Sequence, residues 1–171
     1  MLVVTRPETL PLLDDIDLAI DVFGGAAQGM GATLAHGIGV IQDVEAGRAA
    51  ATVLPSATSG GTAGNLSGKW AGCLVCLGDM PFIRPETYQA LSARLRPDNI
   101  VIPCFDGKPG NPVGFGRDYF PELACLSGDQ GGRELIAGYP QAVLRLDIDD
   151  PAILQDIDTP ADLLRLDEPA N

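Results

Sequence analysis

Residues 72–81, Gly-Cys-Leu-Val-Cys-Leu-Gly-Asp-Met-Pro, constrain the fold of this chain more than any other stretch. Six mostly apolar residues run without a break into Gly-Asp-Met-Pro. A short, uninterrupted apolar run is typical of a strand buried on both faces. The turn that follows places Asp79 at the carboxyl end of that strand, where open α/β sheets bind their ligands. The sequence therefore predicts an α/β fold with a carboxylate at its ligand-binding edge.

Strand-like and helix-like patterns alternate along the rest of the chain. Strands are expected at 2–5, 17–23, 72–77, 99–105, 113–115 and 142–148, and helices at 7–14, 30–41, 85–95, 120–126, 134–137 and 159–166. In the second of these helices, Met30, Leu34 and Ile38 recur at helical spacing, which predicts one buried face. The alternation predicts a three-layer α/β fold with a mostly parallel sheet, formed by residues 1–171 as a single domain.

Residues 47–69 interrupt this alternation. Their central part, 57–65, consists of small, uncharged residues, which is typical of a flexible surface insertion. A lid over a binding site is the alternative interpretation.

The charge of the chain limits its partners. Its 171 residues carry 11 basic and 23 acidic side chains, and the formal net charge is −12. Such a field repels nucleic acid and anionic membranes, so a phosphorylated ligand would need a metal ion or local arginines. No apolar run of about 18 residues and no export signal is present, so we expect a cytoplasmic protein.

The four cysteines do not indicate a metal site. Cys73 and Cys76 form a C-x-x-C pattern, but on a strand two residues with this spacing point to opposite faces. We therefore expect reduced thiols buried in the core. The single histidine, His36, cannot build a multi-histidine site.

Aspartates at two places are candidate Mg²⁺ ligands. Asp79 could bind the cation together with substrate phosphates, or it could simply satisfy the amides of its turn. Asp156 and Asp158 alternate before the last helix, so in extended chain both point to one face. Either could be the second ligand, and the alternative is that they only favour the positive end of that helix. Two carboxylates holding Mg²⁺ would neutralise charge at the α-phosphate of a nucleoside triphosphate.

Two glycine-rich loops, 107–112 and 128–133, could bring backbone amides close to a ligand. Lys108 and Arg133 add positive charge to them in an otherwise acidic chain. Ordinary turns are the alternative interpretation of both loops.

Four segments, in this order, resemble the motifs of the molybdenum cofactor cytidylyltransferase family. They are residues 77–81, 107–113, 128–133 and 156–163, and Gly29-Met30-Gly31 is similar to a fifth motif. The family belongs to the nucleotidyltransferases with a Rossmann-like fold, so the resemblance implies that fold for this chain. It also implies an activity, the transfer of CMP from CTP to molybdopterin carrying molybdenum, with release of pyrophosphate.

The resemblance implies roles for individual residues. Asp79 would be the catalytic Mg²⁺ ligand, with Asp158 as the second ligand and Asp156 as the alternative. The residues implied to lie near the nucleotide base are Gln28, Gly29 and Met30. Those implied to shape the pocket for the molybdopterin-type acceptor are Gly110, Asn111, Pro112, Asp129 and Arg133. A molybdoenzyme or its chaperone would be a further partner.

The front of the chain departs from the family's pattern. Family members begin with a strand and a loop of the type Leu-Ala-Ala-Gly-x-Ser-x-Arg-Met-Gly, followed by a lysine, and this loop wraps the triphosphate. This chain begins at what resembles the family's second strand, and Arg6 is the only lysine or arginine before Arg48. The first strand is central in the family's sheet, so its loss would leave unpaired backbone groups on both neighbours. We therefore expect a truncated start. A catalytically inactive cofactor-binding or delivery module, or a non-functional fragment, is the alternative to an enzyme.

Overall fold

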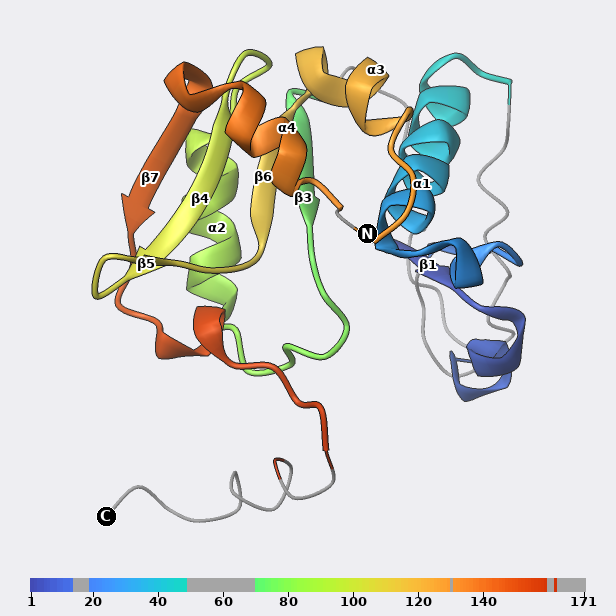
Figure 1. The fold of residues 1–171 in the computed structure, drawn as a ribbon, viewed down its shortest axis with the longest axis horizontal. Helices are drawn as coiled ribbons and strands as arrows, with labels where there is room; N and C mark the ends of the chain where they lie inside the picture. Colours follow the sequence, from blue (N-terminus) through green and yellow to red (C-terminus); the bar gives the residue numbers. More distant parts are fainter. Residues whose placement is uncertain (14–18, 49–69, 130, 160–161, 163–171) are drawn as a thin grey trace, which may run out of the picture. The chain divides into compact units, whose positions relative to one another are not determined.

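The computed structural model describes residues 1–13, 19–48, 70–129, 131–159 and 162. The chain divides into two compact units, which are described separately (Figure 1). Unit 1 comprises Met1–Trp70 and Phe120–Gly138, and unit 2 comprises Ala71–Tyr119 and Tyr139–Asn171. No helix in the described ranges combines the length and apolar character that a membrane span requires.

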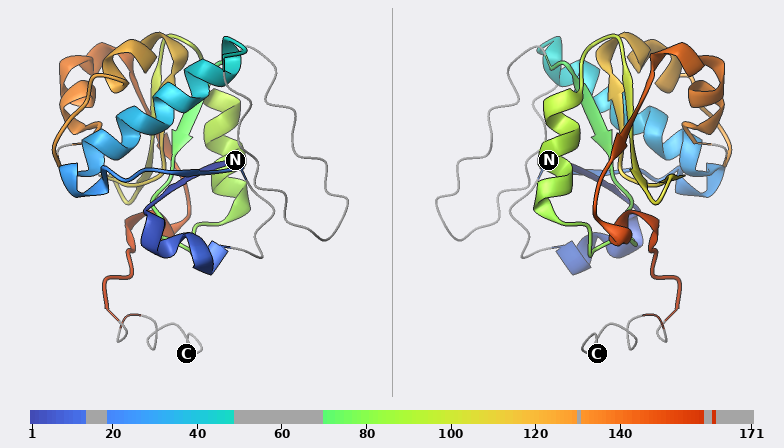
Figure 2. Two further views of the ribbon diagram at one scale, coloured as in Figure 1. Left: turned by 90° about the vertical axis from the view of Figure 1, so that its right-hand side faces the viewer. Right: turned by 90° about the vertical axis from the view of Figure 1, so that its left-hand side faces the viewer.

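Unit 1 contains a two-stranded parallel sheet and a long helix. Strand β1 (Leu2–Thr5) pairs with β2 (Ala19–Val22), with Leu2 opposite Ala19. The remaining elements are the 3₁₀ helices η1 (Pro7–Leu13) and η2 (Ala26–Gln28) and the helices α1 (Met30–Glu45), α3 (Phe120–Leu123) and α4 (Arg133–Gly138). Helix α1 packs against β1 and against α3 (Figure 2). At Gly37 an added Cβ would lie 3.1 Å from Cγ2 of Val4, so the helix approaches the strand closely.

The predicted buried face of α1 is only partly confirmed. Ile38 is 1% exposed and Leu34 is partly buried, but Met30 is 55% exposed. Met30 is the first residue of the helix, and its side chain lies beside Gly131 instead of in the core. Helical spacing therefore identified the buried face of α1 correctly, but it wrongly predicted that Met30, at the amino end of the helix, is buried.

Gly31 provides a test of the packing at the start of α1. Its amide donates a 2.7 Å hydrogen bond to the Gly128 carbonyl, and an added Cβ would lie 2.8 Å from the Ser127 carbonyl oxygen. We expect Gly31→Ala to lower the free energy of unfolding by about 1–3 kcal/mol, because the backbone would have to shift. Gly39→Ala is the matched control, since nothing lies within 4 Å of its Cβ position in the same helix. It should raise stability by about 0.5–1 kcal/mol.

Urea unfolding followed by circular dichroism measures both changes. A Gly31→Ala variant as stable as the Gly39→Ala variant would contradict the close contact between α1 and the segment at 127–128.

Unit 2 is a five-stranded sheet with one longer helix. Its strands are β3 (Gly72–Val75), β4 (Ile100–Phe105), β5 (Lys108–Pro109), β6 (Val113–Gly116) and β7 (Val143–Asp147). The other elements are α2 (Pro85–Arg94) and the 3₁₀ helices η3 (Arg117–Tyr119), η4 (Pro140–Ala142) and η5 (Pro151–Leu154). The strand order is β3-β6-β4-β5, with β7 also paired to β4. Helix α2 lies against one face of this sheet and contacts β3 and β4 (Figure 1).

The pairing directions in unit 2 differ from the prediction. Strand β6 is antiparallel to both β3 and β4, β5 is antiparallel to β4, and only β7 runs parallel to β4. The mixed α/β character is confirmed, but a mostly parallel sheet is not. The reason is the short connection 106–112 between β4 and β6. A parallel crossover needs a dozen or more residues, so β6 returns alongside β4 as an antiparallel strand.

The burial of the strands also differs from the prediction. All four residues of β3 are only partly buried, and within the described residues this strand pairs with β6 alone. The strand buried on both faces is instead β4, where Ile100 and Val101 are 0% exposed and Leu91 of α2 is equally buried. An apolar run alone does not distinguish the edge of a sheet from its centre.

Two predicted segments lie mostly outside the described residues. Residues 49–69 of the expected insertion are not described, and α1 ends just before it at Glu45. Of the expected terminal helix, only its amino end is described. There Thr159 and Asp162 form reciprocal hydrogen bonds between backbone amides and side chains, as in a capping box, which agrees with the predicted cap.

Candidate functional site

Two distant segments that carry candidate metal ligands lie side by side in unit 2. The Ile157 amide donates a 2.9 Å hydrogen bond to the carbonyl oxygen of Asp79. Asp156 and Asp158 flank Ile157, so this bond brings both aspartates next to the Asp79 turn. All three aspartates are exposed, and among the described residues their side chains make no hydrogen bond or ion pair. Three carboxylates therefore face solvent where these two loops meet.

An apolar cluster anchors the two segments beneath these aspartates. Met80, Ile83 and Ala152 are buried together, and Leu77 and Tyr88 pack against them. Met80 directly follows Asp79, and Ala152 belongs to η5, which leads into the 156–158 segment. The exposed aspartates are thus carried on loops whose apolar neighbours are fixed in the core.

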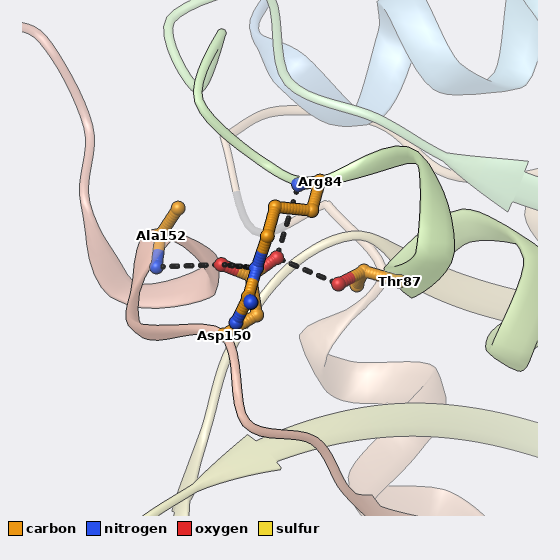
Figure 3. Close-up of polar contacts among 4 residues, drawn as sticks. All are labelled: Arg84, Thr87, Asp150 and Ala152. Carbon is orange, nitrogen blue, oxygen red and sulfur yellow. Dashed lines mark hydrogen bonds and ion pairs between the residues drawn. The ribbon is translucent and has the colours of Figure 1, made fainter.

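A buried carboxylate joins the same two segments (Figure 3). Asp150 is 2% exposed and is the N-cap of η5, where its Oδ1 accepts a 3.2 Å hydrogen bond from the Ala152 amide. Its Oδ2 accepts hydrogen bonds from the Arg84 amide at 3.0 Å and from the Thr87 hydroxyl at 2.6 Å. The Arg84 guanidinium Nε lies 3.4 Å from Oδ1. Asp150 is not among the predicted site residues, although Asp-Pro at 150–151 is a signal for a helix start.

These contacts keep Asp150 ionised. Burial alone would raise the pKa of its carboxyl, but the Thr87 hydroxyl, the Arg84 and Ala152 amides and the Arg84 guanidinium outweigh burial. The pKa of Asp150 therefore lies below its ordinary value.

This lowered pKa makes stability depend on pH. A carboxyl whose pKa is lower in the folded state stabilises the fold above its unfolded pKa of about 3.9. That contribution is lost as pH falls through the lower folded pKa. We expect the free energy of unfolding of the parent chain to fall more steeply below about pH 5 than that of Asp150→Asn. Urea titrations at a series of pH values measure both slopes, and equal slopes would contradict this account.

The first glycine-rich loop packs against η5 in unit 2. The Gly110 amide donates to the Pro103 carbonyl and the Asn111 amide to the Ile153 carbonyl, both at 2.9 Å. An added Cβ at Gly110 would lie 2.3 Å from the Ile153 carbonyl oxygen, so only glycine fits. The peptide between Asn111 and Pro112 is cis, and the Pro112 side chain is fully buried. Pro112 therefore shapes this loop from inside, while Gly110 and Asn111 are partly exposed.

The remaining predicted site residues gather in unit 1. Gly29 has a φ of 105°, and an added Cβ would lie 2.4 Å from Oδ1 of Asp129. Gln28 ends η2 and Met30 begins α1 on either side of Gly29. Arg133 is exposed at the start of α4. The resemblance assigned Gly29 to the base and Asp129 to the acceptor, but the structure places the two residues in contact.

The candidate residues therefore form two groups, each within its own unit. The group in unit 2 contains Asp79, Gly110, Asn111, Pro112, Asp156 and Asp158. The group in unit 1 contains Gln28, Gly29, Met30, Asp129 and Arg133.

The cysteines have no part in either group. All four are free, and burial, followed by the nearby Cys76, raises the pKa of Cys73 to about 12. The sequence predicts core thiols for Cys73 and Cys76, but Cys73 is only partly buried and Cys76 is exposed, so the prediction is wrong for Cys76. Cys104 is buried and Cys125 is exposed. Within the described ranges, no three histidine, cysteine or acidic side chains are close enough to hold a metal ion.

Comparisons with solved structures identify proteins of similar fold. The Rv0371c homolog from mycobacterium sp. strain JC1 is 22% identical, and the match covers 96% of this chain and 72% of that chain with a TM-score of 0.64. This likeness shows a shared fold. Rv0371c from Mycobacterium tuberculosis H37Rv is 31% identical over 56% of this chain and 50% of its own, with a TM-score of 0.49. Its complex with manganese matches with the same identity and TM-score over 51% of that chain. The match thus spans about half the length of Rv0371c.

The family follows from a comparison with domain models. No curated protein is significantly similar to the chain. Residues 1–143, most of its length, match the MobA-like NTP transferase domain. The chain therefore belongs to the family of MobA-like NTP transferase domains.

Proposed function

We propose that this chain acts in the cytoplasm as a Mg²⁺-dependent nucleotidyltransferase that transfers CMP from CTP to a molybdopterin-type molybdenum cofactor. Membership of the MobA-like NTP transferase family supports nucleotidyl transfer. The observation that carries the proposal is the hydrogen bond between the Ile157 amide and the Asp79 carbonyl. This bond joins the backbones of two segments that are far apart in the sequence and that carry Asp79, Asp156 and Asp158.

The chemistry of these side chains fits Mg²⁺. This cation prefers oxygen ligands and is typically held by one or two protein carboxylates, with water and substrate phosphates completing its shell. Asp79 and Asp158 would supply the two carboxylates, with Asp156 as the alternative to Asp158. Among the described residues no three histidine, cysteine or acidic side chains are close enough to hold a metal ion, so water and substrate phosphates would have to supply the other ligands. When bound, Mg²⁺ would neutralise charge on the α-phosphate.

The protein's own part in the reaction would be binding and alignment. In the proposed reaction, an oxygen of the acceptor's terminal phosphate forms a bond to the α-phosphorus of CTP. The bond from that phosphorus to the bridging oxygen breaks, and pyrophosphate leaves in line with the attack. Gly110 and Asn111 would contact the acceptor from unit 2.

Calorimetry with CTP tests the proposal. We expect the chain to bind CTP when Mg²⁺ is present and to lose this binding in EDTA, and we expect weaker binding of ATP and GTP. Pyrophosphate release on addition of a molybdopterin acceptor would then measure transfer. If Mg²⁺ induced no binding of any nucleoside triphosphate, the proposal would be wrong. Binding of the pterin without CTP would indicate the alternative, a catalytically inactive cofactor-binding or delivery module.

A further inference from the structure

Asp150 lies outside the proposed set of metal ligands, yet its carboxylate touches both segments that carry them. Two of its donors, the Arg84 amide and the Thr87 hydroxyl, lie at the start of α2, shortly after Asp79. A third donor, the Ala152 amide, lies at the start of η5, shortly before Asp156 and Asp158. One buried side chain thus connects the loop after β3 with the segment after β7 (Figure 3).

Two further contacts connect the same pair of segments. The backbone hydrogen bond between Ile157 and Asp79 lies at the candidate ligands themselves. The apolar cluster combines Met80 and Ile83 from the segment after β3 with Ala152 from the segment after β7. Asp150, the cluster and the backbone bond therefore connect the same two segments at three places.

Asp150 is firmly held where it connects these segments. Its side chain is 3% exposed, and three hydrogen-bond donors and one guanidinium surround its two oxygens. An ionised carboxylate that accepts three hydrogen bonds has little freedom to move, because a displacement would break at least one of these charge-assisted bonds. The segment after β3 and the segment after β7 are therefore both held by the same carboxylate.

We propose that Asp150 is a positioning residue, which sets the separation between Asp79 and Asp158 for a divalent cation. This inference rests on the proposed function, because it assumes that these aspartates bind the metal. Mg²⁺ needs nearly ideal octahedral geometry, whereas Ca²⁺ tolerates looser and more variable arrangements. Mn²⁺ also takes octahedral oxygen sites and serves here as the paramagnetic substitute for Mg²⁺. Groups that orient metal ligands change metal affinity by about 10- to 100-fold when they are removed.

Thr87→Val tests the inference without touching a proposed ligand. It removes the hydroxyl that donates to Asp150 and keeps the shape of the side chain, while Thr87→Ser keeps the donor. We expect Thr87→Val to weaken Mn²⁺ binding about 10-fold and Ca²⁺ binding by less, and we expect Thr87→Ser to stay within about twofold of the parent. Electron paramagnetic resonance of free Mn²⁺, alone and in competition with Ca²⁺, measures these affinities.

Ile100→Val controls for a general loss of stability. Ile100 is 0% exposed in β4, and its truncation costs about 0.5–1.5 kcal/mol without altering any donor to Asp150. A residue that only stabilises the fold would leave the ratio of Mn²⁺ to Ca²⁺ affinity unchanged, as Ile100→Val should. A second readout needs no metal. Hydrogen exchange of the Ile157 amide should be faster in Thr87→Val than in Ile100→Val.

The outcomes separate the two proposals. If the parent chain does not bind Mn²⁺, the proposed metal site fails, and the role of Asp150 fails with it. If the parent binds but Thr87→Val behaves like Ile100→Val in affinity, selectivity and Ile157 exchange, only the positioning role is wrong. Should Thr87→Val not fold, Arg84→Gln removes just the half-exposed guanidinium and should shift the same ratio in the same direction.

Discussion

Replacing Asp79 with alanine is expected to lower Mg²⁺-dependent CTP binding and CMP transfer by at least about 100-fold. A metal ion at the reacting phosphate contributes several kcal/mol to stabilising the transition state, and about 2.7 kcal/mol corresponds to 100-fold. Asp79 is exposed in its turn, so its replacement should leave the free energy of unfolding nearly unchanged. Calorimetry, pyrophosphate release and urea unfolding on the same preparations measure the three quantities.

Asp98→Ala is the matched control for this loss. It removes the same charge from unit 2, but the Asp98 side chain is 71% exposed and pairs with the equally exposed Arg96. Surface pairs of this kind contribute little, so CTP binding should not change. Asp158→Ala and Asp156→Ala then identify the second ligand, and we expect the larger loss at Asp158. An Asp79→Ala variant that binds CTP and Mg²⁺ like the parent would exclude Asp79 as a ligand.

Replacing Asp150 with alanine is expected to lower the free energy of unfolding by about 3 kcal/mol. The change would leave the buried Thr87 hydroxyl and the Ala152 amide without their acceptor and would remove the cap of η5. Each buried donor without a partner costs about 1–3 kcal/mol, and loss of a cap costs about 1 kcal/mol. The guanidinium of Arg84 is half-exposed and can turn to water, which limits the cost.

Asp149→Ala provides the adjacent control. Asp149 carries the same charge one residue earlier but is exposed, so its loss should change stability by less than about 0.5 kcal/mol. Urea unfolding at pH 7 compares the two variants. If both had the same stability, the contacts of Asp150 would not contribute as the structure indicates.

Local patterns predicted most elements of the fold. The apolar run before Phe105 forms β4, Pro85 begins α2 as predicted, and Thr159 forms the predicted capping hydrogen bonds with Asp162. Such signals lie within a few residues of each other, so one sequence is enough to reveal them. The order of the motifs predicted nucleotidyltransferase membership, which the match over residues 1–143 confirms. Assignment to the molybdenum cofactor branch stays a prediction.

Features that depend on distant pairings could not be predicted. The apolar run at 72–77 predicts a strand buried on both faces and the alternation of elements predicts a mostly parallel sheet, but neither is observed. Asp150 could not be predicted either, because its donors Arg84 and Thr87 belong to a different element far earlier in the chain. No local pattern marks a carboxylate that becomes buried only when two segments meet.

The sequence by itself determined which segments become strands and helices and to which family the chain belongs, because local periodicity and motif order are properties of the chain. Only the tertiary structure decided the direction of β6, the contact between Gly29 and Asp129, and the placement of Ile157 against Asp79. These depend on hydrogen bonds and close contacts between residues far apart in the sequence, and such contacts exist only once the sheet has assembled.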